Sequence, residues 1–427
     1  MNFMLVTTHF PPSVGGVETQ NFDTVKFLAS RGHKVHVIHA GTHPAISVES
    51  SPFEGLPSRL KLDHVAYDES TASGQAIGLP RIMSKVKRCL ADSTGEWLLD
   101  AHERETAIAS LLVKNRLRER RIKVIWTLHG PDMFCCNNYE LRDGVYSCEG
   151  VGSGLSRYGK CLRCLRLDRR SRLRVAEQIG LFNLTSRYCD GFVVKRKKML
   201  EVAARNGYPK ERLFYIPYWV DTHMFRPLPK RCPVEPNPVP QDRLTVMHVG
   251  RLTPAWKGGE LLVRLAEHVC REISDVAFLH VGGFGEDNEL RGKILTSVRR
   301  SGLEKNFIFI GARPRWEIPH WFSLADIAIF PSYYDNLNWT LVEAISCGLP
   351  IVATDVGSIR DVLTHNENAM LAPPDARVLA EEICTLLADI KLRTRLSQNA
   401  RSYAINKLDS RKILPRLETF YLSSVMR

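Results

Sequence analysis

The chain alternates apolar, β-rich runs with helical segments along most of its length, and this alternation starts twice. The first series begins with FMLVTT near the N-terminus, and the second begins with LTVMHVG at residues 244–250. Between the two series, residues 227–240 contain six prolines, which exclude a helix or a central strand there. Because βαβ alternation builds a mainly parallel sheet with helices on both faces, the pattern predicts two doubly wound α/β domains.

The proline-rich segment sets the expected domain boundaries. We expect a first domain over 1–226, a linker over 227–243 and a second domain over 244–408. A final helical segment, 409–427, could cross back to the first domain. Two such sheets whose carboxyl edges face each other would enclose a cleft, which is a usual place for a ligand.

Composition places the chain among soluble globular proteins, with 44% hydrophobic and 25% charged residues. No apolar run reaches the length of a membrane span. The N-terminus has no basic region before its short apolar run, so we interpret this run as a first strand and not as a signal peptide. We therefore expect a cytoplasmic protein.

The net charge of +13 favours an anionic partner: a phosphate-bearing small molecule, an acidic membrane surface or nucleic acid. Basic residues are concentrated in two runs, 157–174 and 195–198. The first run would suit an anionic lipid surface or a phosphate-bearing acceptor, and thus peripheral association with the inner face of a membrane. The alternative is an ordinary solvated surface.

Two loops that follow strands carry features suited to phosphate. Gly15 and Gly16 stand before a helix, where they allow close approach of a ligand to the backbone and to the helix N-terminus. Arg251 and Lys257 flank the loop after the first strand of the second domain, and together they could neutralise a diphosphate. The alternatives are an ordinary turn and two surface cations.

Two carboxylates stand eight positions apart near the end of the second series. Asp335 follows the run DIAIFPS, and Glu343 lies on the next helix, which Cys347-Gly348 closes before the strand IVAT. Such carboxylates could act as an acid/base pair, as metal ligands or as acceptors for sugar hydroxyls. The alternative for Glu343 is an exposed carboxylate on an amphipathic helix.

Taken together, the motifs resemble those of glycosyltransferase family 4, whose members have the two-domain GT-B fold. The resemblance extends over almost the whole chain. The motifs that carry it are, in order, residues 11–12, 15–18, 31–35, 127–129, 216–217, 220–221, 225, 250–251, 257–258, 325–326, 331–332, 343–344 and 347–352.

The resemblance implies a retaining transfer of a hexose-type unit from a UDP- or GDP-sugar to a hydroxyl of a glycan or lipid-linked acceptor, as in cell-surface polysaccharide or lipopolysaccharide biosynthesis. It implies that Glu343 binds the ribose and that Asp335 faces the transferred sugar. Arg251 and Lys257 would hold the leaving diphosphate, so that no metal cofactor is required for catalysis. Gly15 and Gly16 would make room for the donor, and His129 would contact the donor sugar near the reaction centre.

The sequence departs from the family pattern in three places. Asp335 replaces the more common glutamate. Asn336, Leu337 and Asn338 replace the usual turn that contains Phe-Gly, so these three residues become candidate donor contacts specific to this chain. Tyr218-Trp219 replaces the usual Asn-Gly, where the two aromatic rings could shape a ligand pocket or serve as hinge packing.

Cysteines gather just after His129, in an expected insertion at about 130–175. Cys135, Cys148, Cys161 and Cys164 could form a tetrahedral structural zinc site, because the last two make a CxxC pair and reduced thiolates are good zinc ligands. The alternative is a set of free thiols.

Two other functions compete with the transferase. A nucleotide-sugar epimerase on the same fold would also need Arg251, Lys257 and Glu343. A nucleic-acid-binding protein would account for the positive charge and the CxxC pair, but the basic runs lack interleaved aromatic residues, and we expect no nucleic-acid partner.

Overall fold

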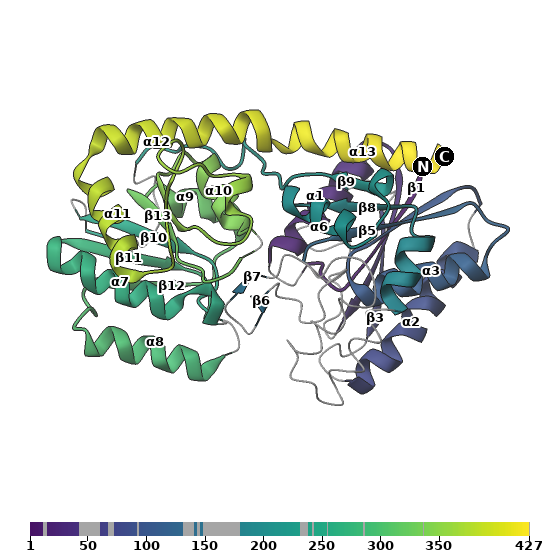
Figure 1. Cartoon of the computed structure of the whole chain (residues 1–427), viewed down its shortest axis with the longest axis horizontal. Helices are drawn as coiled ribbons and strands as arrows, with labels where there is room; N and C mark the ends of the chain where they lie inside the picture. Colours follow the sequence, from purple (N-terminus) through teal and green to yellow (C-terminus); the bar gives the residue numbers. More distant parts are fainter. Residues whose placement is uncertain are drawn as a thin grey trace. The chain divides into compact units, whose positions relative to one another are not determined.

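The chain forms two compact units, which are described separately (Figure 1). Unit 1 comprises Met1–Pro217 and Leu414–Arg427, and unit 2 comprises Tyr218–Ile413. The computed structural model describes residues 1–11, 15–41, 60–66, 72–91, 94–130, 141–142, 146–147, 180–230, 238–240, 243–253, 255–284, 287–335 and 337–426.

Unit 1 is built on a seven-stranded sheet whose paired strands all run parallel, in the order β3-β2-β1-β4-β5-β8-β9. Its strands are β1 (Asn2–Thr7), β2 (Lys34–Gly41), β3 (Leu60–Ala66), β4 (Trp97–Ala101), β5 (Ile122–Leu128), β8 (Gly191–Val194) and β9 (Leu213–Tyr215). The two-residue strands β6 (Leu141–Arg142) and β7 (Tyr146–Ser147) pair separately and antiparallel.

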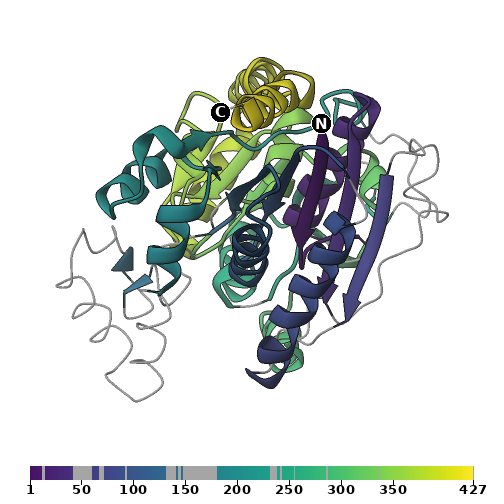
Figure 2. The ribbon, with the colours of Figure 1, turned by 90° about the vertical axis from the view of Figure 1, so that its right-hand side faces the viewer.

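Helices cover both faces of this sheet (Figure 2). They are α1 (Gly16–Ser30), α2 (Ala72–Ala91), α3 (Arg104–Arg116), α6 (Lys197–Arg205) and the short η2 (Lys210–Arg212), and residues 180–188 are also helical. The strand β1 is buried on both sides: Met4 and Val6 join the core cluster that contains α2 and α3, whereas the Phe3 ring lies 5.3 Å from the Tyr421 ring. Burial on both faces explains the nearly continuous apolar runs in the sequence.

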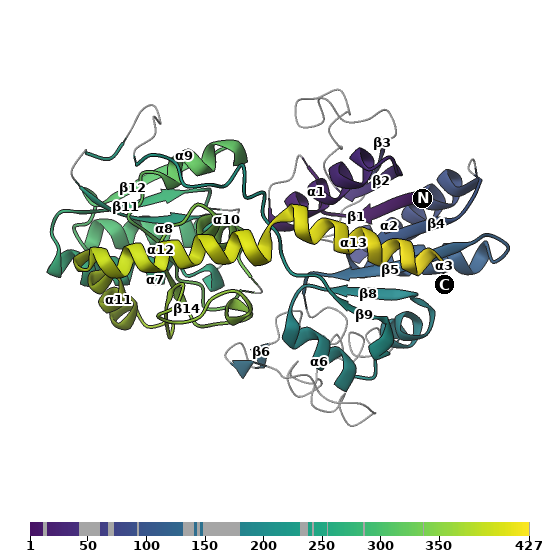
Figure 3. The ribbon, with the colours of Figure 1, turned by 90° about the horizontal axis from the view of Figure 1, so that it is seen from above.

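Tyr421 belongs to the last helix, α13 (Ser410–Met426), which Figure 3 shows in yellow beside the strands of unit 1. Besides Phe3, this helix packs Phe420 on Phe214, with ring centroids 4.4 Å apart. Its Glu418 carboxylate contacts His33 at 2.7 Å and Arg31 at 3.3 Å. The C-terminal segment therefore completes the core of the first unit although it follows the second in sequence.

Unit 2 contains a six-stranded parallel sheet in the order β12-β11-β10-β13-β14-β15. Its strands are β10 (Leu244–Val249), β11 (Val276–Val281), β12 (Phe307–Gly311), β13 (Ile327–Phe330), β14 (Ile351–Thr354) and β15 (Met370–Ala372). Its helical elements are η3 (Ala255–Lys257), α7 (Gly259–Glu272), α8 (Asn288–Arg300), η4 (Arg315–Glu317), α9 (Ile318–Phe322), α10 (Trp339–Ser346), η5 (Ile359–Asp361), α11 (Ala376–Ala388), α12 (Ile390–Tyr403) and the π-helical η6 (Ala404–Leu408).

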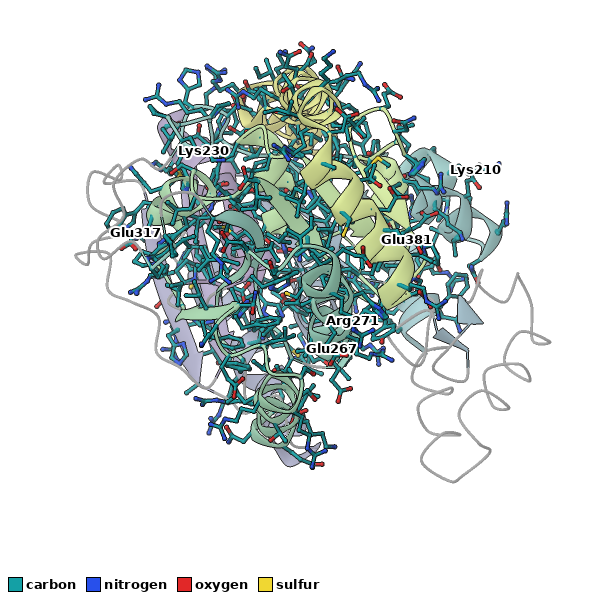
Figure 4. The ribbon with its side chains drawn as sticks, turned by 90° about the vertical axis from the view of Figure 1, so that its left-hand side faces the viewer. Lys210, Lys230, Glu267, Arg271, Glu317 and Glu381 are labelled. Carbon is teal, nitrogen blue, oxygen red and sulfur yellow. The ribbon has the colours of Figure 1, made fainter. Side chains whose placement is uncertain are left out.

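The amphipathic pattern of α7 shows how these helices bind to the sheet. Leu261, Leu265 and Val269 recur every four residues and are fully buried in the core of unit 2. The outward positions include Glu267 and Arg271, which Figure 4 labels on this helix. The apolar face of α7 packs on the sheet. The charged residues lie on the face that is exposed to water.

The boundary between the units differs from the expected one. The sequence placed it at the proline-rich segment after residue 226, but unit 2 already begins at Tyr218. The reason is aromatic packing within unit 2: the Tyr218 and Trp219 rings contact the Trp339 ring edge to face, with centroids 5.6 and 6.0 Å apart. Both aromatic residues are buried, which favours their interpretation as packing residues.

Both sheets reverse their strand order next to the first strand, between β1 and β4 in unit 1 and between β10 and β13 in unit 2. In open parallel sheets such switch points leave a crevice outside the carboxyl ends of the strands, where ligands bind. Among the described residues, no helix is both long and apolar enough to cross a membrane.

Candidate active site

In unit 2 the switch point is bounded by the loops that follow β10 and β13. Gly258 joins them closely: it caps α7 with φ of 79°, and a Cβ at this position would lie 1.9 Å from the carbonyl oxygen of Pro331. A Cβ at Gly357 would lie 1.7 Å from the carbonyl oxygen of Asp335. Only glycine fits at either place, so the backbone of the 331–335 loop is closely packed at both of its ends.

This arrangement brings together two of the predicted site residues. Lys257 Nζ donates to Asp335 Oδ2 at 2.7 Å, and both side chains are about one-fifth exposed. Arg251 lies exposed on the same loop as Lys257, directly after β10. The edge of the sheet therefore presents two cations and one carboxylate close to the N-terminus of α7, whose partial positive charge also favours an anion.

The residues after Asp335 have roles in the local fold. Asn338 caps α10, its Oδ1 accepting from the Thr340 backbone N–H at 3.1 Å. The Thr340 hydroxyl in turn donates to the Val249 carbonyl at 2.7 Å, which ties α10 to the end of β10. Leu337 is buried, and Asn336 lies outside the described residues.

Glu343 projects from α10 and is only 2% exposed, which excludes the alternative of a surface carboxylate. Arg315 Nε donates to Glu343 Oε1 at 2.7 Å, and the Arg315 guanidinium lies over the Phe225 ring at 5.0 Å. A buried carboxylate needs such a partner because an isolated charge in a protein interior is costly. The ion pair fixes the orientation of the Glu343 carboxylate.

Arg315 was not predicted as a site residue from the sequence. It follows β12 by a few residues, so its place after a strand is the signal that could have identified it. Gly357 gave no such signal, because nothing local shows that it contacts Asp335.

In unit 1, Gly15 caps α1 and Gly16 is its first residue. A carboxylate already stands at this helix N-terminus: a Cβ on Gly15 would lie 2.3 Å from Glu18 Oε2, and Glu18 Oε1 contacts His9 Nδ1 at 3.1 Å. Asn21 fixes the loop by donating to the His9 carbonyl at 2.7 Å. Glu18 therefore competes with any phosphate for the positive end of α1.

His129 follows β5 and belongs to a buried polar cluster at the carboxyl edge of the unit 1 sheet. Its Nε2 lies 2.8 Å from Nδ1 of His102, and His102 Nε2 lies 3.1 Å from Asp100 Oδ2. Burial, with smaller contributions from the neighbouring His102, Lys195 and His9 side chains, holds the pKa of His129 well below its usual range. His129 is therefore a neutral imidazole at neutral pH, able to donate or accept a hydrogen bond but not to supply positive charge.

The second basic run is not a surface patch. Lys195 and Arg196 follow β8 and are only 2% and 3% exposed. Burial lowers the pKa of Lys195 to about 7, against the opposing effect of the Asp100 carboxylate. The run therefore contributes two of its four residues to the interior of unit 1, and the first basic run, 157–174, lies outside the described residues.

The cysteines proposed to bind zinc, Cys135, Cys148, Cys161 and Cys164, also lie outside the described residues. Within the described part of the chain, one group of three metal-ligating side chains comes together: His36, Asp63 and Cys89. Here His36 Nε2 contacts Asp63 Oδ2 at 2.7 Å, and Lys85 forms an ion pair with the other Asp63 oxygen. The cationic side chain already balances the carboxylate, so we assign no metal to this cluster.

Family comparisons agree with this two-part architecture. A family model for glycosyltransferase family 4 matches residues 14–224, and a model for glycosyl transferases group 1 matches residues 234–403. The first match covers most of unit 1 and the first few residues of unit 2, and the second match lies within unit 2.

Relatives match over most of the chain. N-acetyl-alpha-D-glucosaminyl L-malate synthase of Bacillus anthracis is 23% identical, covering 96% of this chain and 94% of the relative. A phosphatidylinositol N-acetylglucosaminyltransferase component of Arabidopsis thaliana is 30% identical, covering 88% of this chain and 72% of the relative. Among solved structures, Anabaena HepE in complex with UDP and glucose has a TM-score of 0.73 at 19% identity, covering 99% of this chain and all of that chain.

The two parallel-sheet units, the ligand edges at their switch points and the matches along both units agree with one another. The chain belongs to the glycosyltransferases of family 4, with the GT-B fold.

Proposed function

We propose that the protein transfers a hexose-type sugar, with retention of configuration, from a UDP- or GDP-sugar to a hydroxyl of a glycan or lipid-linked acceptor. The observation that carries the proposal is the Lys257–Asp335 ion pair at the switch point of unit 2, with Arg251 exposed on the same loop as Lys257. It combines cations for a diphosphate with a carboxylate for sugar hydroxyls on one edge of one sheet. The structure of HepE in complex with UDP and glucose supports uracil as the base of the donor nucleotide.

The side chains divide the work according to their chemistry. Arg251 and Lys257 neutralise the diphosphate and stabilise the charge that grows on it as the glycosidic bond breaks. These cations supply the electrostatic stabilisation that a divalent metal provides in other enzymes, so catalysis proceeds without a metal cofactor. Asp335 accepts hydrogen bonds from the transferred sugar. Glu343, held by Arg315, accepts from the ribose hydroxyls.

On the unit 1 side, His129 contacts the donor sugar near the reaction centre, and Gly15 and Gly16 leave room for the donor. The leaving diphosphate assists deprotonation of the acceptor hydroxyl, so no covalent intermediate on the protein is required. The Arabidopsis relative is named for a phosphatidylinositol acceptor, which supports a lipid-linked acceptor for this chain as well. A role in cell-surface glycan synthesis, at the inner face of a membrane, would suit such an acceptor.

Donor binding is tested first. The protein is screened by thermal shift with UDP-glucose, UDP-N-acetylglucosamine, GDP-mannose and the free diphosphates, because a ligand that binds only the native state raises the unfolding midpoint. We expect a nucleotide sugar to raise the midpoint of the wild type and not that of Lys257→Met. Lys293→Met is the matched control, because Lys293 is an exposed lysine of the same unit, paired with Glu289 on α8.

Turnover then separates a transferase from an epimerase. A transferase releases nucleoside diphosphate in proportion to glycosylated acceptor, whereas an epimerase changes the sugar and releases neither product. Release of an epimeric nucleotide sugar without any diphosphate would overturn the proposed transfer. Anomeric proton NMR of the product would establish whether configuration is retained.

A further inference from the structure

A continuous chain of polar contacts connects the C-terminal helix to His129 within unit 1. The Tyr421 hydroxyl donates to Asp100 Oδ2 at 2.5 Å, and the Thr127 hydroxyl donates to Asp100 Oδ1 at 2.7 Å. His102 bridges Asp100 and His129 through its two ring nitrogens, at 3.1 and 2.8 Å. The sequence places Asp100 and His102 at the end of β4 and His129 just after β5, which are neighbouring parallel strands.

Because the side chains in this series of contacts are buried, the position of each hydrogen atom can be deduced from these contacts alone. Asp100, His102, Thr127 and Tyr421 are each no more than 4% exposed, so water does not substitute for a missing partner. An ionised carboxylate only accepts hydrogen bonds, and both hydroxyls donate to Asp100. The ring nitrogen of His102 that faces Asp100, Nε2, must therefore carry a hydrogen.

The hydrogen on His102 Nε2 determines which ring nitrogen of His129 carries a hydrogen. At about pH 8, above the usual titration range of an imidazole, a His102 ring with its hydrogen on Nε2 has a lone pair on Nδ1, which can only accept. His129 is then the donor in the contact between the two rings, through Nε2–H. Because a neutral imidazole carries one N–H, the Nδ1 of His129 then keeps its lone pair.

We propose that Asp100 and His102 are positioning residues that select the Nε2–H tautomer of His129, while Thr127 and Tyr421 hold the Asp100 carboxylate in place. The catalytic consequence rests on the proposed function, in which His129 contacts the donor sugar. The tautomer itself does not depend on that function. The charged or titratable side chains that interact electrostatically with these residues include Lys195, near both Asp100 and His129, His9, near His129, and Glu103, near His102.

The tautomer is measured directly by ¹⁵N NMR of protein labelled at histidine, at about pH 8, above the usual titration range of this side chain. The chain has 14 histidines, so the signals are assigned from spectra of His129→Gln and His102→Gln. We expect both His102 and His129 of the wild type to have the Nε2–H pattern. A wild-type His129 with its hydrogen on Nδ1 would overturn the proposal.

Removal of the Asp100 carboxylate should change the relative populations of the two His129 tautomers. In Asp100→Leu, nothing fixes the hydrogen of His102 on Nε2, so the Nδ1–H form of His129 should increase. Asp100→Asn keeps the shape with a weaker, uncharged acceptor and should shift the population in the same direction by less. The matched control is Asp63→Asn, which alters another Asp–His contact of unit 1, 2.7 Å from His36, and should leave the His129 signals unchanged. Identical His129 signals in the wild type and both Asp100 variants would contradict the proposal.

Kinetics test the consequence for transfer. Partners that orient metal-binding histidines affect activity by about 10- to 100-fold, and by analogy we expect a fall of this size in kcat for Asp100→Asn, with little change in KM for the nucleotide sugar. A change in KM alone would contradict a role for the tautomer in turnover. If the wild type transfers no sugar, the proposed function fails while the NMR result still decides the tautomer.

Discussion

The Lys257 ammonium and the Asp335 carboxylate neutralise each other across 2.7 Å, although each was predicted to contact a different part of the donor. A diphosphate carries more negative charge than one carboxylate, so it can attract Lys257 more strongly than Asp335 does. We therefore expect donor binding to exchange the partner of Lys257 and to release Asp335 for the sugar hydroxyls. The close packing of Gly258 and Gly357 against the two ends of the 331–335 loop would keep the Asp335 backbone in place during this exchange.

Replacement of Lys257 tests the first half of this exchange. Lys257→Met keeps the apolar stem and removes the charge, so stabilisation of the leaving diphosphate should be lost. We expect kcat/KM to fall by about 100- to 1,000-fold, the usual effect of removing one preorganised electrostatic group. Steady-state transfer assays measure the effect, and Lys293→Met should retain the wild-type value.

Replacement of Asp335 tests the second half. Asp335→Asn removes the charge that holds Lys257, so titration calorimetry should show UDP binding that is at least as tight as in the wild type. The hydrogen bonds to the transferred sugar weaken, and kcat should therefore decrease. Weaker UDP binding in Asp335→Asn would show that the carboxylate does not compete with the diphosphate for Lys257.

The Arg315–Glu343 pair predicts a coupled loss of stability. Arg315→Met leaves the Glu343 carboxylate buried beside an apolar side chain, and breaking a buried pair in this way costs about 3 to 5 kcal/mol. The double variant Arg315→Met/Glu343→Gln removes both charges and should be more stable than Arg315→Met alone. Urea unfolding of the wild type, the single variants Arg315→Met and Glu343→Gln, and the double variant measures the coupling. Strictly additive changes would mean that the two side chains do not depend on each other.

Glu343 should also affect donor recognition separately from stability. In Glu343→Gln the ribose hydroxyls meet a weaker, uncharged acceptor, so KM for the nucleotide sugar should increase more than kcat decreases. The comparison is made with free UDP and with the nucleotide sugar, since both carry the ribose. Glu289→Gln, on the exposed face of α8, serves as the control.

A buried histidine pair in unit 2 predicts sensitivity to acid. His248 and His280 lie on β10 and β11 with their Nδ1 atoms 3.0 Å apart. Burial lowers the pKa of His280 from 6.5 to about 4, and it holds the pKa of His248 well below its usual range. Between about pH 6.5 and 4, the unfolded chain therefore binds more protons than the folded one, and stability must decrease as the pH falls.

Urea unfolding at pH 7.5 and pH 5 measures this effect. We expect His280→Gln to lose less stability over this interval than the wild type, because it removes one histidine that is forced to stay neutral. His268→Gln, on α7, should have the wild-type dependence. An equal loss of unfolding free energy in the wild type, His280→Gln and His268→Gln would show that groups other than His280 cause the acid sensitivity.

The sequence determined the class of fold and the edges of its sheets. Apolar runs at strand length, interrupted by helices with apolar residues every three to four positions, leave two parallel sheets as the consistent solution. Because parallel strands place all their carboxyl ends at one edge, Arg251, Asp335 and His129 could be predicted as ligand-facing from their places after strands. Asp100 and His102 obey the same rule and were missed because they did not match a motif.

The tertiary structure decided which of these residues act together. Tyr421 and Asp100 are separated by 321 positions, and no local pattern indicates that the last helix returns to hold a carboxylate on β4. The same holds for Arg315 with Glu343 and for Gly357 with the Asp335 loop. Sequence periodicity indicates which face of a helix or strand is buried. The residues that this face contacts depend on how distant segments pack. A buried charge is stable only beside the few partners that can pair with it.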